Sequence, residues 1–340
     1  MAFPLLAPAP EGPLDPGPRP SFSVVIPAYE VAEYVAEAVR SALDQTLAPV
    51  EVIVVDDGSP DDVAGALAPY RDRIVLIRQE NQGPGAAKLN GARAASGDFV
   101  SFLDGDDFYL PERLATLAEA AVRRPDLAIL GTNAWIDLGG KRLRQVYDET
   151  WTFAVADQRR EILRRCFLLG HAAARRELLV ALPEADRNAL DDWECWARLI
   201  LGGARAGLVD LPLSCYRVRP GSISTNRTSL YRRGVATMAL LRSDPTLTPG
   251  ERATLAGTEA EWRRLFAIEA ARDALRAGDG RARRLLLKVA GDRRQGWRPR
   301  AKAVVSMLAP GRARKLLLER DRTFWIGPGG LHVARDEPPG

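Results

Sequence analysis

The sequence predicts an α/β protein with a doubly wound, mostly parallel sheet and a helical extension at its C-terminal end. Short β-branched runs alternate with amphipathic stretches between residues 22 and 125, which is typical of βαβ units. Acidic or turn-forming residues directly follow three of these runs, at the strand ends where such sheets bind ligands. Beyond about Leu127 the alternation weakens, and from Ser229 the chain is expected to be helical and rich in arginine.

Each expected element has a local reason. Residues 22–26 are a β-branched run that ends at Pro27, and residues 32–46 place their apolar side chains on one helical face. Pro84 and Pro111 stand where helices begin, since the first helical turn loses nothing through the missing N–H of proline. The remaining strands are expected at 51–55, 74–77, 98–103 and as a pair near 205–218, and the remaining helices at 60–70, 84–95, 157–170 and 190–201.

Composition separates both ends of the chain from its body. Residues 1–20 are rich in proline and are expected to form a disordered lead. Residues 281–322 contain 14 basic and 3 acidic residues, although the 340-residue chain has a net charge of only +4. The first 20 residues lack a signal-peptide pattern, and no apolar run reaches the roughly 20 residues of a membrane-spanning helix. We therefore expect a cytoplasmic protein, soluble or attached to the inner face of the membrane.

Cysteine and histidine are sparse. Cys166, Cys195 and Cys215 match neither a disulfide framework nor a zinc motif. With only His171 and His332, a histidine-based metal site is set aside. Carboxylates are then the expected metal ligands, and they favour Mg²⁺ or Mn²⁺.

Asp104-Gly105-Asp106 follows an expected strand. Two carboxylates one residue apart suit one hard divalent cation, which in turn bridges phosphate oxygens and stabilises the charge of a leaving diphosphate. The alternative interpretation is a solvated surface turn, since turns are rich in Asp and Gly.

Two further acidic pairs stand at element ends. Asp56 and Asp57 follow a strand, where a carboxylate can accept hydrogen bonds from a base or a ribose. Their alternative role is an Asx turn that leads into the next helix. Asp191 and Asp192 begin an amphipathic helix, where either can deprotonate an acceptor hydroxyl. The alternative there is a favourable interaction of two acids with the helix dipole.

The ordered set of motifs resembles family 2 glycosyltransferases of the GT-A fold. The resemblance covers residues 22 to about 226, and its motifs lie at 23–29, 51–59, 81–83, 97–107, 110–114, 191–199 and 216–224. It implies a catalytic GT-A domain over 21–226, with a nucleotide-sugar half (21–125) and an acceptor half (126–226), before a basic helical extension over 227–340.

The resemblance also implies an activity. The expected enzyme is a metal-dependent, inverting, hexosyltransferase-like glycosyltransferase that uses Mg²⁺ or Mn²⁺ and a nucleotide-diphosphate sugar, with UDP-sugar as the expected donor. The expected acceptor is a glycan or a lipid-linked hydroxyl in cell-surface polysaccharide or glycoconjugate synthesis, and no nucleic-acid partner is expected.

The same resemblance assigns roles to individual positions. Asp192 is the expected base, and Asp191 precedes it where the family usually has Glu. Asp106 binds the metal, together with Asp104, which lies near the ribose and the donor sugar. The other expected nucleotide-sugar contacts are Pro27, Ala28, Tyr29, Glu30, Asp56 and Asp57, of which Asp57 contacts the base.

Two positions depart from the family pattern. Lys88 stands where the family usually has Arg, so it keeps the charge for a nucleotide-sugar contact but loses the two-pronged geometry. The alternative is a solvated helix lysine. Arg219 replaces a His, and it can meet phosphates but cannot ligate a metal.

The basic stretch 281–322 has two interpretations. Leucines and valines interleave with its arginines, so a helix pair there can rest on anionic lipid and bring the enzyme to a lipid-linked acceptor. The alternative is a set of helices that pack on the catalytic domain, with solvated arginines outward.

Three rival functions are weighed against this one. A nicotinamide dehydrogenase needs a glycine-rich turn after the first strand, and a nucleotidyltransferase needs a glycine-rich basic loop there; residues 27–30 supply neither. A glycan- or nucleotide-binding protein on a catalytically retired fold is the third rival, and the retained Asp106 and Asp192 argue against it.

Overall fold

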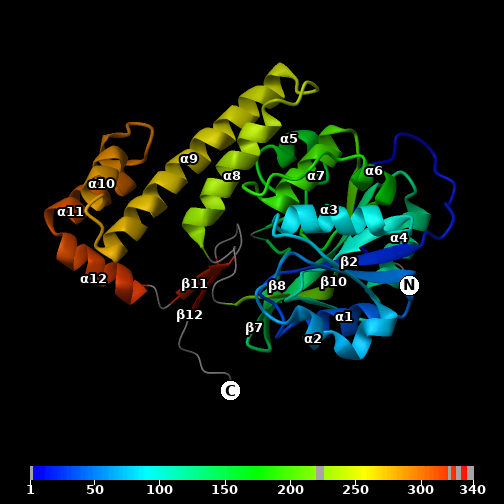
Figure 1. Ribbon diagram of the computed structural model, residues 1–340. Helices are drawn as coiled ribbons and strands as arrows, with labels where there is room; N and C mark the ends of the chain where they lie inside the picture. The colour runs from blue at the N-terminus through cyan, green and yellow to red at the C-terminus, as the bar shows by residue number, and fades with distance from the viewer. Residues whose placement is uncertain (1–2, 150, 220–225, 321–322, 327–330, 335–340) are drawn as a thin grey trace. The chain divides into compact units, whose positions relative to one another are not determined.

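The computed structural model describes residues 3–149, 151–219, 226–320, 323–326 and 331–334 (Figure 1). The chain divides into two compact units. The first comprises Met1–Arg217 with Asp244–Glu251, and the second comprises Val218–Ser243 with Arg252–Gly340.

The first unit is built on a mixed sheet with the strand order β1-β10-β7-β9-β5-β2-β3-β4. Four neighbouring strands run parallel: β4 (Val75–Arg78), β3 (Glu51–Asp56), β2 (Phe22–Ala28) and β5 (Phe99–Phe102). β9 (Ala173–Arg175) is antiparallel to β5 and to β7 (Ile129–Leu138), which is parallel to β10 (Ala206–Arg217). β1 (Leu5–Leu6) and β6 (Phe108–Tyr109) pair with β10, and β8 (Lys141–Gln145) pairs with β7. This confirms the α/β fold, and the antiparallel pairing of β1, β6, β8 and β9 makes the sheet mixed.

Helices cover both faces of the parallel strands. In Figure 1, α1 (Val35–Leu43) and α3 (Pro84–Ala94) lie on opposite faces of the sheet. α1 buries the side chains of Val35, Ala38, Val39 and Ala42, whose spacing forms one helical face. They join Val24 and Ile26 of β2 in the main hydrophobic core, where burial of each valine side chain contributes about 1.5–3 kcal/mol.

The remaining elements of the first unit connect and cover the sheet. They are α2 (Val63–Ala66), a 3₁₀ turn (Ala68–Arg73), α4 (Arg113–Arg123), α5 (Gln158–Ile162), α6 (Arg176–Val180) and α7 (Asp191–Leu201). α7 begins within one residue of the expected helix, whereas the helix expected over 157–170 ends at Ile162. Residues 163–170 continue as turns and irregular backbone, with Phe167 and Leu168 buried.

Two other expectations were wrong. The strand pair near 205–218 is one long strand, β10, whose register against β7 shifts on both sides of Pro212 because proline has no N–H to donate. The lead expected to be disordered instead lies on the first unit: Leu5 and Leu6 pair with β10, and the Gly17 N–H donates to Val122 O at 3.0 Å. Apolar residues among the prolines explain this, because Phe3 and Leu5 pack against the main core.

The second unit is mainly helical, as expected. Its elements are α8 (Arg227–Leu241), most of α9 (Pro249–Ala277), α10 (Ala282–Gly291), α11 (Trp297–Leu308) and α12 (Pro310–Arg320), followed by the antiparallel strands β11 (Thr323–Ile326) and β12 (Leu331–Ala334), which were not foreseen. A small core joins Ala271, Leu286, Val289 and Ala303. Among the described residues, no helix has the length and apolar character needed to cross a membrane.

Candidate active site

The parallel strands bring the predicted site residues to one edge of the sheet. Ala28 is in register with Asp56, and Val25 is in register with Phe102, so β2, β3 and β5 end side by side. The residues that follow these strands therefore meet at the carboxyl edge, where ligands bind in such folds.

At the end of β2, only part of the predicted nucleotide pocket reaches the surface. Pro27 and Ala28 are buried within the strand, whereas Tyr29 and Glu30 are exposed. Glu30 has a φ of 53°, and its N–H donates to the Ser59 Oγ at 2.7 Å. This bond ties the turn after β2 to the turn after β3.

At the end of β3, Asp56 and Asp57 each accept hydrogen bonds from nearby backbone N–H groups. The Asp56 Oδ1 accepts from the Ser59 N–H at 2.8 Å, and the Asp56 Oδ2 lies 3.3 Å from the Arg78 Nη1, whereas the residue that caps α2 is Asp62. Asp57 is 2% exposed and accepts the backbone N–H groups of Gln82 and Gly83, each at 2.8 Å. Asp57 thus fixes the loop before α3, and its contact with a base stays a prediction.

After β5, the acidic run 104–107 forms a tight turn. The Asp107 N–H donates to Asp104 O at 3.0 Å. A Cβ at Gly105 would lie 2.9 Å from Pro27 O and 2.9 Å from the Val31 Cγ2, so the turn closes against β2 only with glycine there.

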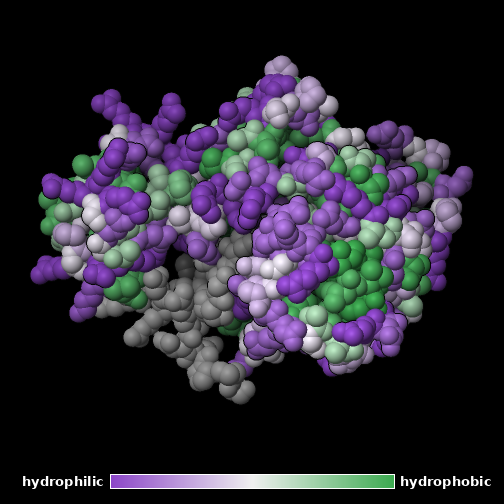
Figure 2. All heavy atoms as spheres, viewed as in Figure 1, coloured by the Kyte–Doolittle hydropathy of each residue, from purple (hydrophilic) through white to green (hydrophobic). Residues whose placement is uncertain are grey.

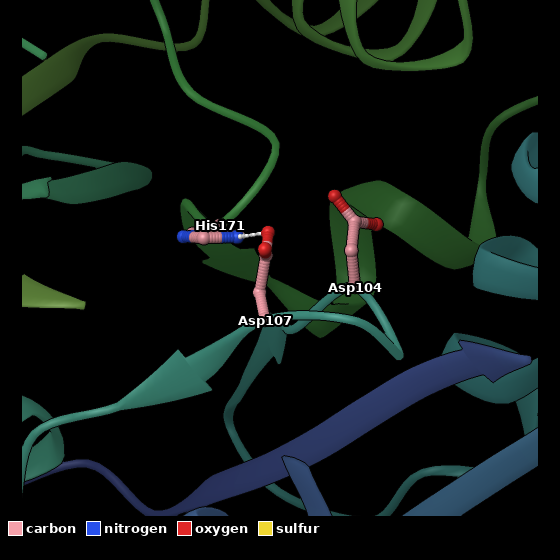
Figure 3. A group of neighbouring side chains, drawn as sticks. All are labelled: Asp104, Asp107 and His171. Atoms are coloured by element: carbon pink, nitrogen blue, oxygen red, sulfur yellow. Dashed lines mark hydrogen bonds and ion pairs between the residues drawn. The ribbon is translucent and has the colours of Figure 1, made fainter. Parts of the chain in front are cut away.

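Asp104, Asp107 and His171 form a candidate metal cluster, in which one ligand atom of each lies within 4.8 Å of the others (Figure 3). Asp107 and His171 point toward each other, with 2.6 Å between the Asp107 Oδ2 and the His171 Nε2. The Asp107 Oδ1 accepts the Arg217 N–H at 2.6 Å, and the His171 Nδ1 lies 3.0 Å from the Ser214 Oγ.

Burial governs the charges of this cluster. It lowers the pKa of His171 to about 4, so the imidazole is neutral at neutral pH, the form that ligates metals. Burial and the nearby charge of Asp106 raise the pKa of Asp107 well above its ordinary value. Two carboxylates and a neutral imidazole fit a divalent cation such as Mn²⁺.

Asp106, the predicted metal ligand, lies on the same turn but outside this three-residue group. It is half-buried, and its backbone oxygen accepts the Arg217 Nη1 at 2.9 Å. The charge of Asp106 acts on the pKa of both Asp107 and His171, which places it beside the cluster.

Lys88 contacts both the acidic turn 104–107 and Asp192, the predicted base. Its Nζ lies 3.1 Å from the Asp104 Oδ1, 2.8 Å from the Asp191 Oδ2 and 2.6 Å from the Asp192 Oδ1. Lys88 is 5% exposed, so the interpretation as a solvated helix lysine is wrong. Burial alone would lower the pKa of Lys88, but the three carboxylates hold it well above its ordinary value, and the side chain stays an ammonium.

Asp191 and Asp192 form the first residues of α7 and face Lys88 on α3. Burial and the adjacent charge of Asp191 raise the pKa of Asp192, and Lys88 opposes this rise. The Asp192 side chain is still 34% exposed, so a substrate hydroxyl can reach it.

A small cavity of about 20 Å³ opens beside this cluster, between Lys88, Phe102 and Trp196. Asp191 and Asp192 are also among the residues that line it.

Sequence reasoning assigned no individual role to three residues that shape the site: Asp107, His171 and Arg217. Asp107 had a signal, because it continues the acidic run, and Arg217 lies in the 216–224 motif. The Arg217 Nη2 contacts the Glu37 Oε2 at 2.7 Å in addition to its two bonds to the acidic turn. His171 had no such signal, since it follows no motif. Arg219 is half-buried, and residues 220–224 of the same motif lie outside the described residues.

A buried arginine forms hydrogen bonds that hold the backbone of the candidate metal cluster. The guanidinium of Arg113 on α4 is fully buried and donates to the Thr132 Oγ1 and to the backbone oxygen of His171. It also lies 4.5 Å from the centre of the Tyr109 ring. These bonds fix the backbone of His171 and so the direction of its ring.

Sequence comparison connects this geometry to known proteins. Residues 23–181 match a family described as Glycosyl transferase family 2. Over 135 residues the chain is 33% identical to the putative glycosyltransferase EpsH of Bacillus subtilis, a match that covers 39% of each chain. Over 133 residues it is 34% identical to a chondroitin synthase of Escherichia coli, with 38% of this chain and 19% of the synthase covered. The matched region thus spans well under half the length of these relatives.

Structure comparison finds the same fold over nearly the whole chain. A crystal structure of S. aureus TarS 1–349 in complex with UDP-GlcNAc has a TM-score of 0.56 and 19% identity, with 92% of this chain and 99% of that chain covered. The mannosyltransferase PcManGT from Pyrobaculum calidifontis, in complex with GDP-Man and Mn²⁺, has a TM-score of 0.52 and 21% identity, with 92% and 90% covered.

Proposed function

We propose that the protein is a family 2 glycosyltransferase of the GT-A fold that transfers a sugar from a nucleotide-diphosphate donor to an acceptor hydroxyl, because residues 23–181 match that family and the fold is that of glycosyltransferase structures. The observation that carries the proposal is the Lys88 bridge. The Lys88 ammonium contacts Asp104 of the acidic turn and both Asp191 and Asp192 at the start of α7. The acidic turn and the candidate base therefore share one site.

The proposed donor is a UDP-sugar. The structural neighbours are described with UDP-GlcNAc and with GDP-Man, which supports a nucleotide sugar. Tyr29 and Glu30 are exposed at the carboxyl edge beside the turn that Asp57 fixes, and we assign the nucleotide to this edge. The proposed acceptor is a hydroxyl of a cell-surface polysaccharide or glycoconjugate.

The proposed reaction inverts the anomeric configuration. Asp192 takes the proton of the acceptor hydroxyl, and the acceptor oxygen forms a bond to the anomeric carbon. The bond from that carbon to the diphosphate breaks on the opposite face, and its electron pair leaves with the diphosphate oxygen. The raised pKa of Asp192 suits this role, because a base works best with a pKa near the working pH.

A divalent cation, Mn²⁺ or Mg²⁺, completes the proposed site. Asp104, Asp106, Asp107 and His171 are the residues that would hold it, and carboxylates and a neutral imidazole suit such an ion. When bound, the cation neutralises charge on the leaving diphosphate. Arg217 and Arg113 keep the turn and the His171 backbone in place.

Diphosphate release from a panel of nucleotide sugars, with Mn²⁺ and an added glycan acceptor, tests the proposal. One donor is expected to give acceptor-dependent release, and Asp192→Asn is expected to lower its rate by about 10²–10⁴-fold, the usual contribution of a general base. Asp44→Asn, an exposed acid at the end of α1, is the matched control and should keep the parent rate. An Asp192→Asn variant as active as the parent would remove Asp192 as the base.

A further inference from the structure

One helix of the second unit turns an apolar face outward. On α11, Trp297 is 73% exposed, Val305 61% and Leu308 81%, and Val304 is 42% exposed. Their spacing of 7, 8 and 11 residues from Trp297 places all four on one side of a helix with 3.6 residues per turn. Surface helices of soluble proteins normally place polar residues there.

The opposite side of α11 packs into the small hydrophobic core of the second unit. Ala303 is buried, and it packs with Met307 against Leu286 and Val289 of α10. The outward stripe is therefore a second apolar face, beyond what the packing of this unit uses. The neighbouring helices also carry exposed apolar side chains, Leu287 on α10 and Leu316 and Leu318 on α12. In Figure 2, the surface over these helices carries hydrophobic residues among strongly hydrophilic ones.

Basic residues surround the stripe. Residues 281–318 contain 12 basic residues and one acidic residue, Asp292. On α11 itself, Arg298 and Lys302 are exposed, and the guanidinium of Arg298 lies 5.6 Å from the centre of the Trp297 ring. An aromatic residue with a cation over its ring, beside aliphatic side chains and a dense positive charge, is typical of a helix at a membrane interface.

We propose that α11, with the exposed side chains of α10 and α12, binds the surface of an anionic lipid bilayer. Trp297, Val304, Val305 and Leu308 enter the headgroup layer, and the surrounding arginines and lysines contact the lipid phosphates. The helix lies in the plane of the interface, because none of the described helices has the length and apolar character to cross the bilayer.

Two other occupants fit the surface less well. A second copy of the chain would bring the same excess of positive charge to the contact, which disfavours a symmetric pair. A nucleic acid would satisfy the basic residues but would leave Trp297, Val305 and Leu308 without an apolar environment. A bilayer offers both an anionic layer and an apolar layer.

Lipid binding by α11 is independent of the proposed glycosyl transfer, since it needs neither the donor nor Asp192. If both hold, the surface brings the enzyme to acceptors that are anchored in the same membrane. The test below therefore uses binding alone.

Flotation of the purified full chain with lipid vesicles tests the surface. The parent protein is expected to float with vesicles that contain phosphatidylglycerol and to stay behind with vesicles of phosphatidylcholine alone. Val305→Glu with Leu308→Glu is expected to lower the vesicle-bound to free ratio by about tenfold or more, since it removes two inserting side chains and adds two repelled charges. Its matched control is Val50→Glu with Val155→Glu, which changes exposed apolar residues of the first unit by the same charge.

The control variant is expected to float like the parent, and both double variants are expected to keep the parent melting temperature. Three results would overturn the proposal: no flotation with anionic vesicles, equal loss in both double variants, or no loss in either. Sedimentation velocity measures whether the parent protein and the two double variants are monomers or dimers. A parent dimer that only the α11 variant dissociates, without flotation, would identify the stripe as an interface between copies and also overturn lipid binding.

Discussion

Lys88 sets the electrostatics of the candidate active site, because one buried ammonium faces three carboxylates. Asp191 and Asp192 are adjacent acids, and the charge of Asp191 disfavours the ionisation of Asp192. The ammonium at 2.8 Å and 2.6 Å offsets this repulsion and keeps Asp192 able to accept a proton. The residue that sequence reasoning assigned to the nucleotide sugar therefore contacts the predicted base, and its role there is positional and electrostatic.

Substitutions at positions 88 and 191 should move the pH profile of kcat in opposite directions. Asp192 must be ionised to act as a base, so activity falls as pH drops through its pKa. Lys88→Met removes the charge that lowers this pKa, so the acidic limb should move to higher pH, with a loss of at most about tenfold at pH 7 for each unit of movement. Asp191→Asn removes a charge that raises the pKa, so its acidic limb should move to lower pH.

The pH dependence of kcat between pH 4 and pH 9 or so is the measurement, with Lys88→Arg as the control that keeps the charge. If the acidic limbs of Lys88→Met and Asp191→Asn moved in the same direction, the electrostatic role of Lys88 would be contradicted. An unchanged profile in all three variants would show that Asp192 does not limit the rate.

At the scale of elements, local patterns predicted most of what the structure shows. β2, β3, β5, α3 and α7 lie close to their expected ranges, because β-branched runs, prolines at helix starts and apolar spacing are local signals. Residues 1–20 and β10 differ from expectation for a long-range reason. Phe3 and Leu5 find a core that composition does not reveal, and β10 continues through Pro212 because β7 pairs with it on both sides.

Two helical glycines, one packed closely and one in open space, give a stability prediction: Gly91 of α3 and Gly257 of α9. A Cβ at Gly91 would lie 2.4 Å from the Val25 Cγ1 and 3.2 Å from the Val55 Cγ2, so Gly91→Ala should lower the free energy of unfolding by about 1–3 kcal/mol. Gly257 in α9 has nothing within 4 Å of its added Cβ, and Gly257→Ala should raise that free energy by about 0.5–1 kcal/mol through helix propensity.

Urea unfolding of each variant beside the parent checks this pair. The midpoint should fall for Gly91→Ala and rise for Gly257→Ala. A Gly91→Ala variant as stable as the parent would show that α3 does not pack closely on β2.

At the scale of the whole molecule, the sequence predicted the α/β class and the edge of the sheet that carries the site, but not how distant parts complete it. Lys88 meets Asp191 across 103 residues and Asp192 across 104, and Asp107 meets His171 across 64. No local pattern encodes these contacts. The Lys88 contacts join α3 to α7, and the His171 contact arises because β9 inserts between β5 and β7 beside the acidic turn. The histidine that composition set aside is thereby part of the candidate metal cluster.

The central claim is that the acidic turn and its neighbours hold a metal-bound nucleotide diphosphate. Thermal-shift titration with UDP, GDP, dTDP and CDP, each with Mn²⁺ or with EDTA, tests it most directly. We predict that one diphosphate, UDP in the first place, raises the melting temperature with Mn²⁺ only, and that Asp106→Ala abolishes the shift. Binding at a hundredfold excess over Kd stabilises the folded state by about 2.7 kcal/mol, enough for a clear shift. The absence of a shift for all four diphosphates would contradict the claim and favour a catalytically retired fold.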